Sequence, residues 1–263
     1  MNMNPIIGSH DLVWLVLDSL RYDVAHREMT AGNTPHLAAL FPGGWEKRYS
    51  PASFTYPAHQ AFFAGFLPTP ADPAADPARL FAVRFAGSKS TGSGTCVFKG
   101  TDIVSGLAER SYHTLCLGGV GFFNQRTPLS RVLPGYFAES HWTPATGVTS
   151  PTSTETQFAL AAQRLREIPA TTRVFLFINL SAIHSPNRCY LPGKKHDDLD
   201  THAAALRYVD SCLPVLIAAL RQRAPSHLLA FSDHGTLYGE DGFTGHRTGH
   251  PDVYTVPYAA TLL

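Results

Sequence analysis

The segment HLLAFSDHG, residues 227–235, decides the fold of this chain and the place of its chemistry. Its first five residues are typical of a buried strand, and Asp233 and His234 follow that strand directly. A second apolar run, at residues 12–17, also ends in an acid, Asp18. Because open α/β sheets hold their ligands beyond the carboxyl ends of the strands, we expect these polar side chains to meet at one edge of a sheet.

The rest of the chain continues the alternation of strands and helices that an α/β sheet with two covered faces requires. Strand-like runs lie at residues 12–17, 80–85, 113–117, 174–180 and 227–231. One helix is predicted at residues 153–168, with Thr152 and Glu155 spaced as a capping box at its start. Another is predicted at residues 198–223, where Pro214 indicates a kink or a break.

Composition limits the organisation of the protein and its partners. A length of 263 residues suits one large α/β domain, so residues 1–263 are predicted to form a single domain. The formal net charge of +1 gives no electrostatic reason to expect nucleic acid or an anionic membrane surface as a partner. Residues 68–77 and 87–95 are rich in Pro, Gly, Ser and Thr, which is typical of exposed loops.

The cysteines and the N-terminus indicate the compartment. The four cysteines show no C-x-x-C pairing, and the first residues lack the pattern of a signal peptide, so we expect a cytoplasmic protein. The longest apolar runs, such as residues 174–180, are shorter than the roughly 20 residues of a membrane-spanning helix. A soluble protein without a membrane partner is the resulting prediction.

Four side chains from three segments make up a candidate metal site, namely Asp18, Thr55, Asp233 and His234. Thr55 lies in the loop that opens a helix predicted at residues 58–65, where backbone N–H groups favour an anion. An oxygen-rich set with one imidazole suits Zn²⁺ or Mn²⁺ better than Ca²⁺, and a hydroxyl on such a metal becomes a nucleophile. A turn role for Asp18 and a helix cap for Thr55 are the structural alternatives.

Taken in order, these segments resemble the sulfatase-like branch of the alkaline phosphatase superfamily. The matching blocks are VWLVLDSLRYD at residues 13–23, NTPHL at 33–37, SDHGTLYGEDGFTGH at 232–246 and VPY at 256–258. They resemble the family's first strand with its metal-binding acid, its T-P-N-L segment, its S-D-H-G block ending in H or K, and its closing strand. The resemblance implies a three-layer α/β/α sandwich with a mostly parallel sheet, and a single metallohydrolase domain without the C-terminal subdomain of sulfatases.

The nucleophile block distinguishes between branches of this family. TYPAH at residues 55–59 aligns with the sulfatase motif C-x-P-S-R, whose cysteine becomes formylglycine, a conversion that threonine cannot undergo. The pattern is most similar to phosphoethanolamine transferases and lipoteichoic acid synthase, in a soluble and compact form. It implies a metal-dependent hydrolase or transferase that acts on a phosphate ester through a phosphothreonine at Thr55.

Two further residues of these blocks are candidate substrate contacts. His59 takes the arginine position of the sulfatase motif, and Arg21 is the nearest cation to Asp18 in the sequence. The alternatives are solvation of His59 on the face of its helix, and pairing of Arg21 with Asp23 as part of the scaffold.

Three histidines complete the predicted site. The segment FINLSAIHSP, which contains His184, resembles the family strand that ends in H-x-P. Two-metal relatives place an Asp two or four positions earlier, where this chain has Ala and Leu, so one ion is expected and a second site looks incomplete. His184 and His246 are predicted to hold phosphate oxygens, to protonate the leaving group or to bind that second ion. His250 competes with His246, because two-metal members carry a ligating histidine shortly before the closing strand.

Two other functions stay open. One is a sulfatase or phosphonate hydrolase on the same scaffold, and the other is a non-catalytic metal-binding accessory protein that has kept the fold. The expected partner is a small-molecule or peptide-linked phosphoester. The sequence indicates neither its identity nor the oligomeric state.

Overall fold

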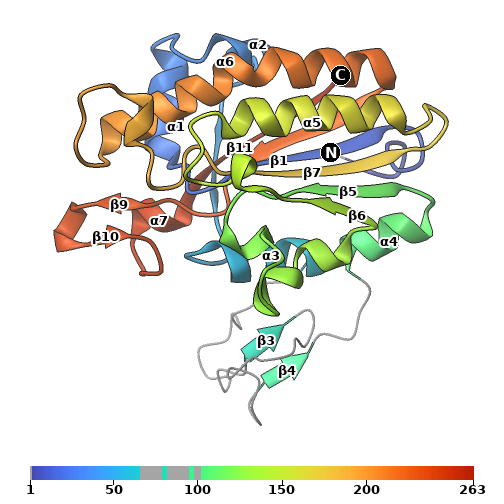
Figure 1. The fold of residues 1–263 in the computed structure, drawn as a ribbon, viewed down its shortest axis with the longest axis horizontal. Coiled ribbons are helices and arrows are strands. Elements are labelled where there is room, and N and C mark those ends of the chain that lie inside the picture. Colours follow the sequence, from blue (N-terminus) through green and yellow to red (C-terminus); the bar gives the residue numbers. More distant parts are fainter. Residues whose placement is uncertain (1, 66–78, 82–94, 98–101) are drawn as a thin grey trace.

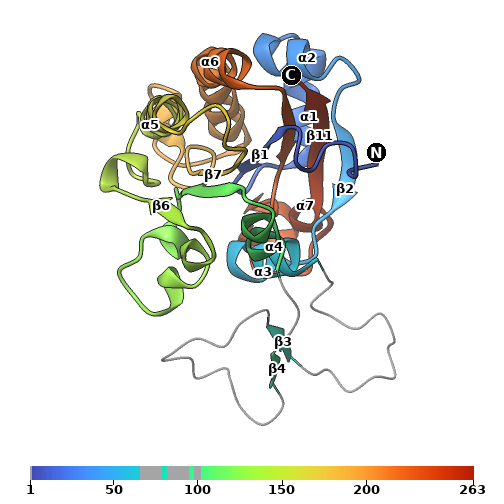
Figure 2. The same cartoon turned by 90° about the vertical axis from the view of Figure 1, so that its right-hand side faces the viewer.

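The protein, described here from a computed structural model, is built around a seven-stranded sheet with helices on both faces (Figures 1 and 2). The described residues are 2–65, 79–81, 95–97 and 102–263. This arrangement confirms the predicted α/β/α sandwich. The loops predicted at residues 68–77 and 87–95 lie outside the described residues, except for Thr95.

The sheet has the strand order β2-β11-β8-β1-β7-β5-β6 and is mostly parallel. Its parallel strands are β1 (Asp11–Leu17), β5 (His113–Leu117), β6 (Glu139–His141), β7 (Val174–Leu180) and β8 (Ser226–Phe231). At one edge, β11 (Thr255–Leu262) pairs antiparallel with β8 and with β2 (Glu46–Tyr49). Four of the five predicted runs are therefore strands of this sheet.

Of the fifth predicted run, at residues 80–85, the described residues 80 and 81 do not join the sheet. Its described part belongs to β3 (Arg79–Phe81), which pairs with β4 (Thr95–Val97) in a separate two-stranded ladder. A short apolar run carries no information about its pairing partner, which explains the error.

The two faces of β1 bury different cores. Val13, Leu15 and Leu17 belong to an aliphatic core, while Leu12 and Val16 belong to a core rich in phenylalanine. The aliphatic core lies under α1 (Tyr22–Thr30), α2 (Pro35–Leu40), α5 (Ser153–Glu167) and α6 (Leu199–Arg223), and the aromatic core lies under α3 (Thr55–Ala64) and α4 (Ile103–Glu109). A strand buried on both faces reads as a continuous apolar run, which is why the sequence revealed it.

The longest helix, α6, behaves as a core helix. It is capped by the Asp198 carboxylate, which accepts hydrogen bonds from the N–H groups of Asp200 and Thr201, and it is not broken at Pro214. Pro214 itself is exposed, so its ring lies on the solvent side of the helix. By length and composition alone, α6 could cross a membrane. The lengths of the uninterrupted apolar runs in the sequence had not indicated this. In the structure, 61% of the most apolar 18-residue window of α6 is buried inside the protein.

The capping box predicted at the start of α5 does not form. Thr152 is the N-cap residue, but its side chain makes no capping hydrogen bond. Its backbone dihedrals, φ −111° and ψ 22°, differ from the extended conformation that directs an N-cap hydroxyl toward the helix N–H groups.

A buried ion pair ties the start of β1 to the end of α6. The Arg223 guanidinium donates to Asp11 Oδ2 at 2.8 Å and also to the carbonyl oxygens of Leu165, Ile168 and Thr172. Asp11 is buried, and its other carboxylate oxygen accepts from the N–H of Val174 in β7. One side chain therefore links β1, α5, α6 and the entry to β7.

We expect the substitution Arg223→Met to lower the free energy of unfolding by about 3–5 kcal/mol, because the buried Asp11 carboxylate loses the nearer of its two guanidinium partners and three carbonyl oxygens lose a donor. Arg221→Met, in the exposed neighbour on the same helix turn, should change it by less than about 0.5 kcal/mol. Chemical denaturation of both variants measures the difference. Equal stabilities would show that the ion pair contributes nothing to the fold.

Candidate metal centre and adjoining pocket

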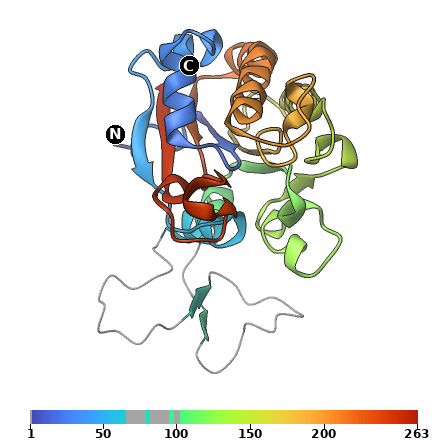
Figure 3. The same cartoon turned by 90° about the vertical axis from the view of Figure 1, so that its left-hand side faces the viewer.

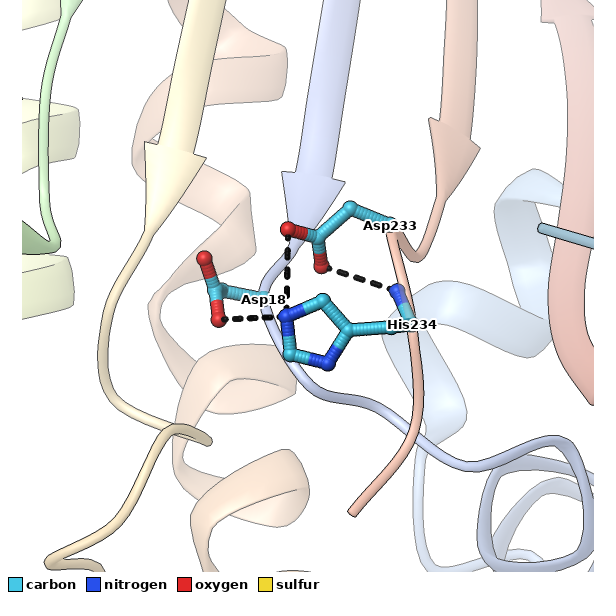
Figure 4. A group of neighbouring side chains, drawn as sticks. All are labelled: Asp18, Asp233 and His234. Carbon is cyan, nitrogen blue, oxygen red and sulfur yellow. Dashed lines mark hydrogen bonds and ion pairs between the residues drawn. The ribbon is translucent and has the colours of Figure 1, made fainter. Parts of the chain in front are cut away.

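The parallel register of β1 and β8 brings two acids side by side. Val16 pairs with Phe231, so Asp18 and Asp233 each lie two residues beyond this pair. Figure 4 shows the two carboxylates beyond the strand ends, with one imidazole nitrogen of His234 facing both of them. One ligand atom from each of these three buried residues lies within 4.8 Å of the others.

His234 is oriented as metal-binding histidines usually are. Its Nδ1–H donates to the carbonyl oxygen of Gly235 at 2.9 Å, which directs the lone pair of Nε2 toward the acids. Nε2 lies 3.9 Å from Asp18 Oδ1 and 3.6 Å from Asp233 Oδ2. The ring is therefore held as a nitrogen ligand facing two carboxylates.

Gly235 permits the close packing that supports this ring. Its N–H donates to the carbonyl oxygen of Val253 in α7 (Pro251–Tyr254) at 2.7 Å. A Cβ atom at residue 235 would lie 1.9 Å from the carbonyl oxygen of Asp252. Glycine is required here because α7 packs directly against the backbone that follows His234.

The hydrogen bonds of the two acids test whether a cation fits. Asp18 accepts from the Ser19 hydroxyl at 3.0 Å and from Asn179 Nδ2 at 2.9 Å. Asp233 Oδ1 accepts from the N–H groups of Ser19 and His234, but Asp233 Oδ2 is buried and has no hydrogen-bond partner. A buried carboxylate oxygen without a donor is costly, and a divalent cation would satisfy it. The residues present thus fit the predicted metal.

Electrostatics lead to the same conclusion. Burial raises the pKa of Asp233 well above its usual range, and the adjacent Asp18 carboxylate raises it further. Burial also acts to raise the pKa of Asp18, but His184, His234 and the Asn179 hydrogen bond outweigh it and lower that pKa. Burial lowers the pKa of His234. The two carboxylates are therefore difficult to ionise at the same time, and the imidazole beside them is neutral. A bound cation would stabilise both carboxylates in the ionised form and would take the place of the proton on Asp233.

Thr55 reaches this group from α3, in the helix layer that covers the aromatic core. It is the first residue of α3, so the helix begins three residues earlier than predicted, with Phe54 in the N-cap position. Its buried hydroxyl oxygen lies 3.4 Å from Asp18 Oδ2 and 3.3 Å from His234 Nε2. The structure thus brings all four predicted ligands together.

The three predicted histidines separate into two groups. The His246 ring centroid lies 4.5 Å from that of His234 and 5.6 Å from that of His184, and burial, helped by these two rings, lowers the pKa of His246 to about 4. His250 instead caps α7, where Nδ1 accepts from the N–H of Asp252 at 3.1 Å. His184 and His246 therefore lie beside the acids, while the side chain of His250 caps the N-terminus of α7.

A pocket of about 380 Å³ opens over Thr55. Its wall combines rings and aliphatic side chains with amide, hydroxyl and cationic groups. The lining residues are Thr55, Val120, Gly121, Phe122, Asn124, Thr127, Leu129, Ser130, Val148, His184, His246 and Arg247. A larger apolar pocket of about 410 Å³, next to Trp14 and Leu229, holds none of the predicted site residues.

His59 is neither a substrate contact nor a solvated helix residue, contrary to both expectations. Its side chain is fully buried, and its Nδ1–H donates to the Thr55 carbonyl oxygen at 2.7 Å. The ring packs edge-on against phenylalanines of the aromatic core, including Phe123 and Phe177, and burial lowers its pKa to about 4. The reason is that α3 enters the core at its first turn, which a sequence motif does not reveal.

Arg21 belongs to the scaffold rather than to the pocket wall. Its buried guanidinium donates to Asp23, Glu240 and Asp252, which come from three separate segments. Glu240 lies between β9 (Leu237–Tyr238) and β10 (Thr244–Gly245), the hairpin that leads to His246. Arg21 therefore connects the segment after β1 with this hairpin and with α7. Figure 3 shows the hairpin and α7 beside each other, in red.

Sequence reasoning missed two residues of the site. Asn179 is buried, donates to Asp18 and accepts from the N–H of Val120 at 3.0 Å, so it fixes the orientation of the first acid. A single amide inside the apolar run VFLFINL was the available signal. Arg247 lines the pocket, and its place directly after His246 was the only indication in the sequence.

Comparisons with known proteins agree on the fold. No family model matches the sequence, and no curated protein matches it. The C-terminal periplasmic domain of phosphoethanolamine transferase EptC from Campylobacter jejuni matches over 97% of this chain and 79% of its own, with a TM-score of 0.64 and 13% identity. The corresponding Escherichia coli domain, solved in complex with Zn, matches over 96% and 72%, with a TM-score of 0.62 and 15% identity.

A protein in the alkaline phosphatase superfamily from Vibrio parahaemolyticus matches with a TM-score of 0.61 and 17% identity, over 97% of this chain and 60% of its own. This chain thus has the fold of the alkaline phosphatase superfamily, as the sequence resemblance implied. Within that fold, it is similar in structure to phosphoethanolamine transferase domains.

These comparisons correct the expectation of a cytoplasmic location. Both EptC structures are described as periplasmic domains, which places the structural neighbours outside the cytoplasm. Unpaired cysteines and the first residues of a chain are weak indicators of compartment, because a domain can be exported as part of a longer protein.

Substituting Arg21→Met should loosen the hairpin that leads to His246 and lower the free energy of unfolding by roughly 1–3 kcal/mol, because three carboxylates lose a shared donor. Hydrogen exchange of residues 237–246 should become faster. Arg48→Met is the matched control, since Arg48 forms a more exposed ion pair with Glu46. Unchanged exchange in the Arg21 variant would contradict the positioning role.

Proposed function

We propose that this protein is a metal-dependent hydrolase or transferase of phosphate esters in which Thr55 is the nucleophile. The observation that carries the proposal is the position of the Thr55 hydroxyl, between Asp18 and His234 and at the floor of the pocket. The fold supports it, because the matched structures include phosphoethanolamine transferases and a complex with Zn. The periplasmic origin of those domains supports a site of action outside the cytoplasm.

Asp18, Asp233 and His234 would hold the metal, with the Thr55 oxygen as a fourth ligand. Zn²⁺ or Mn²⁺ suits this donor set, which has three oxygen ligands and one imidazole. Bound there, the ion would lower the pKa of the Thr55 hydroxyl and offset negative charge on the phosphate. One ion is expected; a second would need His184 and His246 as ligands.

The side chains of the protein supply the remaining steps. The Asp18 carboxylate orients the Thr55 hydroxyl, whose oxygen forms the bond to phosphorus while the bond from phosphorus to the leaving oxygen breaks. His184 and His246 line the same pocket, where an imidazole can accept the proton that the Thr55 hydroxyl loses and deliver it to the leaving oxygen, and where both rings can bind non-bridging oxygens. Water or an alcohol then attacks the phosphothreonine, and the Thr55 hydroxyl is restored. Water gives hydrolysis and an alcohol gives transfer.

Replacing Thr55 by Ala should abolish turnover of an activated ester such as p-nitrophenyl phosphate, lowering kcat by at least about 10³-fold, since Thr55 carries the one hydroxyl among the four proposed ligands. Thr55→Ser, which keeps the hydroxyl, should retain measurable activity. Mass spectrometry of the acid-quenched wild type should find phosphate on Thr55. Full activity in the alanine variant would exclude the proposed nucleophile.

Metal analysis tests the site independently of any substrate. The purified protein, reconstituted with Zn²⁺ or Mn²⁺, should retain about one equivalent of metal, and Asp233→Ala should reduce this by more than 10-fold because a buried ligand is lost. Asp241→Ala removes an exposed acid of the hairpin region and should bind metal normally. Tight metal binding without turnover on any ester would favour the non-catalytic alternative, and faster turnover of sulfate than of phosphate esters would favour a sulfatase.

A further inference from the structure

Arg247 is held against the loop that carries the nucleophile. It directly follows His246 and has a left-handed backbone conformation, with φ at +75°. Such a conformation is unfavourable for a residue with a side chain and persists where other contacts hold it. One such contact is the hydrogen bond from the Arg247 N–H to the Ser53 carbonyl oxygen, at 2.9 Å.

The side chain of Arg247 is fixed against the same loop. Its Cζ atom lies 4.9 Å from the ring centroid of Phe54, a cation–π contact. Phe54 immediately precedes Thr55, so both the backbone and the guanidinium of Arg247 are positioned on the two residues before the nucleophile. Arg247 also lines the pocket that opens over Thr55.

Arg247 dominates the charge of that pocket. Among the described residues that line it, Arg247 is the one lysine or arginine, and none is an aspartate or glutamate. Within the described part of the chain, no carboxylate forms an ion pair with Arg247. A guanidinium stays charged at every physiological pH and presents several donors in one plane.

We propose that the Arg247 guanidinium binds a non-bridging oxygen of the substrate phosphate and makes the site selective for phosphate monoesters over diesters. The inference rests on the proposed function and adds the substrate class to it. A monoester carries close to two negative charges at pH 8, and a diester carries one. A fixed cation beside the reacting phosphate therefore stabilises the monoester more, and a guanidinium can contact two of its oxygens.

The test compares two esters that share a leaving group, p-nitrophenyl phosphate and ethyl p-nitrophenyl phosphate, at pH 8 with the metal-loaded protein. Arg247→Gln should lower kcat/KM for the monoester by about 10- to 100-fold and for the diester by less than about 3-fold. Arg247→Lys should fall between wild type and Arg247→Gln. The control is Arg126→Gln: Arg126 also lies over an aromatic ring, that of Trp142, but does not line the pocket.

Calorimetry supplies a readout that needs no turnover. Inorganic phosphate should bind metal-loaded Arg247→Gln at least about 10-fold more weakly than wild type, and dimethyl phosphate should bind the two proteins alike. Equal losses for both esters, or no loss for either, would overturn the inference while leaving the proposed function intact. A wild type that binds no phosphate and cleaves neither ester would overturn both.

Discussion

The site depends on one constraint, the parallel register between β1 and β8. Because Val16 lies opposite Phe231, the two acids leave the sheet at the same level and on neighbouring strands. A shift of the register by one residue would turn one acid toward the opposite face of the sheet. The apolar residues of both strands fix the register, since each face of β1 is buried in its own core. The core of the fold and the geometry of the site are therefore set by the same contacts.

The same burial makes it unfavourable for both carboxylates of the site to be ionised. Removing two carboxylates from water is unfavourable unless cations or donors compensate them. Asp18 receives such donors from Ser19 and Asn179, whereas Asp233 keeps one oxygen without a donor. Of the two acids, therefore, only Asp233 has a carboxylate oxygen that receives no hydrogen bond. A structural pair of acids would be expected to have donors on both carboxylates.

The sequence predicted the parts of the protein that depend on local pattern. Continuous apolar runs identified β1, β5, β7 and β8, and the residues at two of their ends identified Asp18, Asp233 and His234. It could not predict how segments pack once they meet. His59 is buried because α3 enters the aromatic core, Arg21 is surrounded by acids from distant segments, and Arg247 faces Phe54 across a gap of almost 200 residues in the chain. The environment of each of these three residues depends on tertiary contacts, which cannot be predicted from residue spacing or composition.

The central position of β1 has a consequence for how the protein is made. β1 precedes both of its neighbours in the chain, because β7 and β8 are synthesised much later. Until then the N–H and C=O groups along its edges and its apolar side chains have no partner within the sheet, a state that favours association with other chains. Pairings between segments far apart in sequence also form slowly. Placing β1 between two strands that are synthesised later therefore makes it depend on other contacts, from this chain or from a chaperone, until β7 and β8 are made.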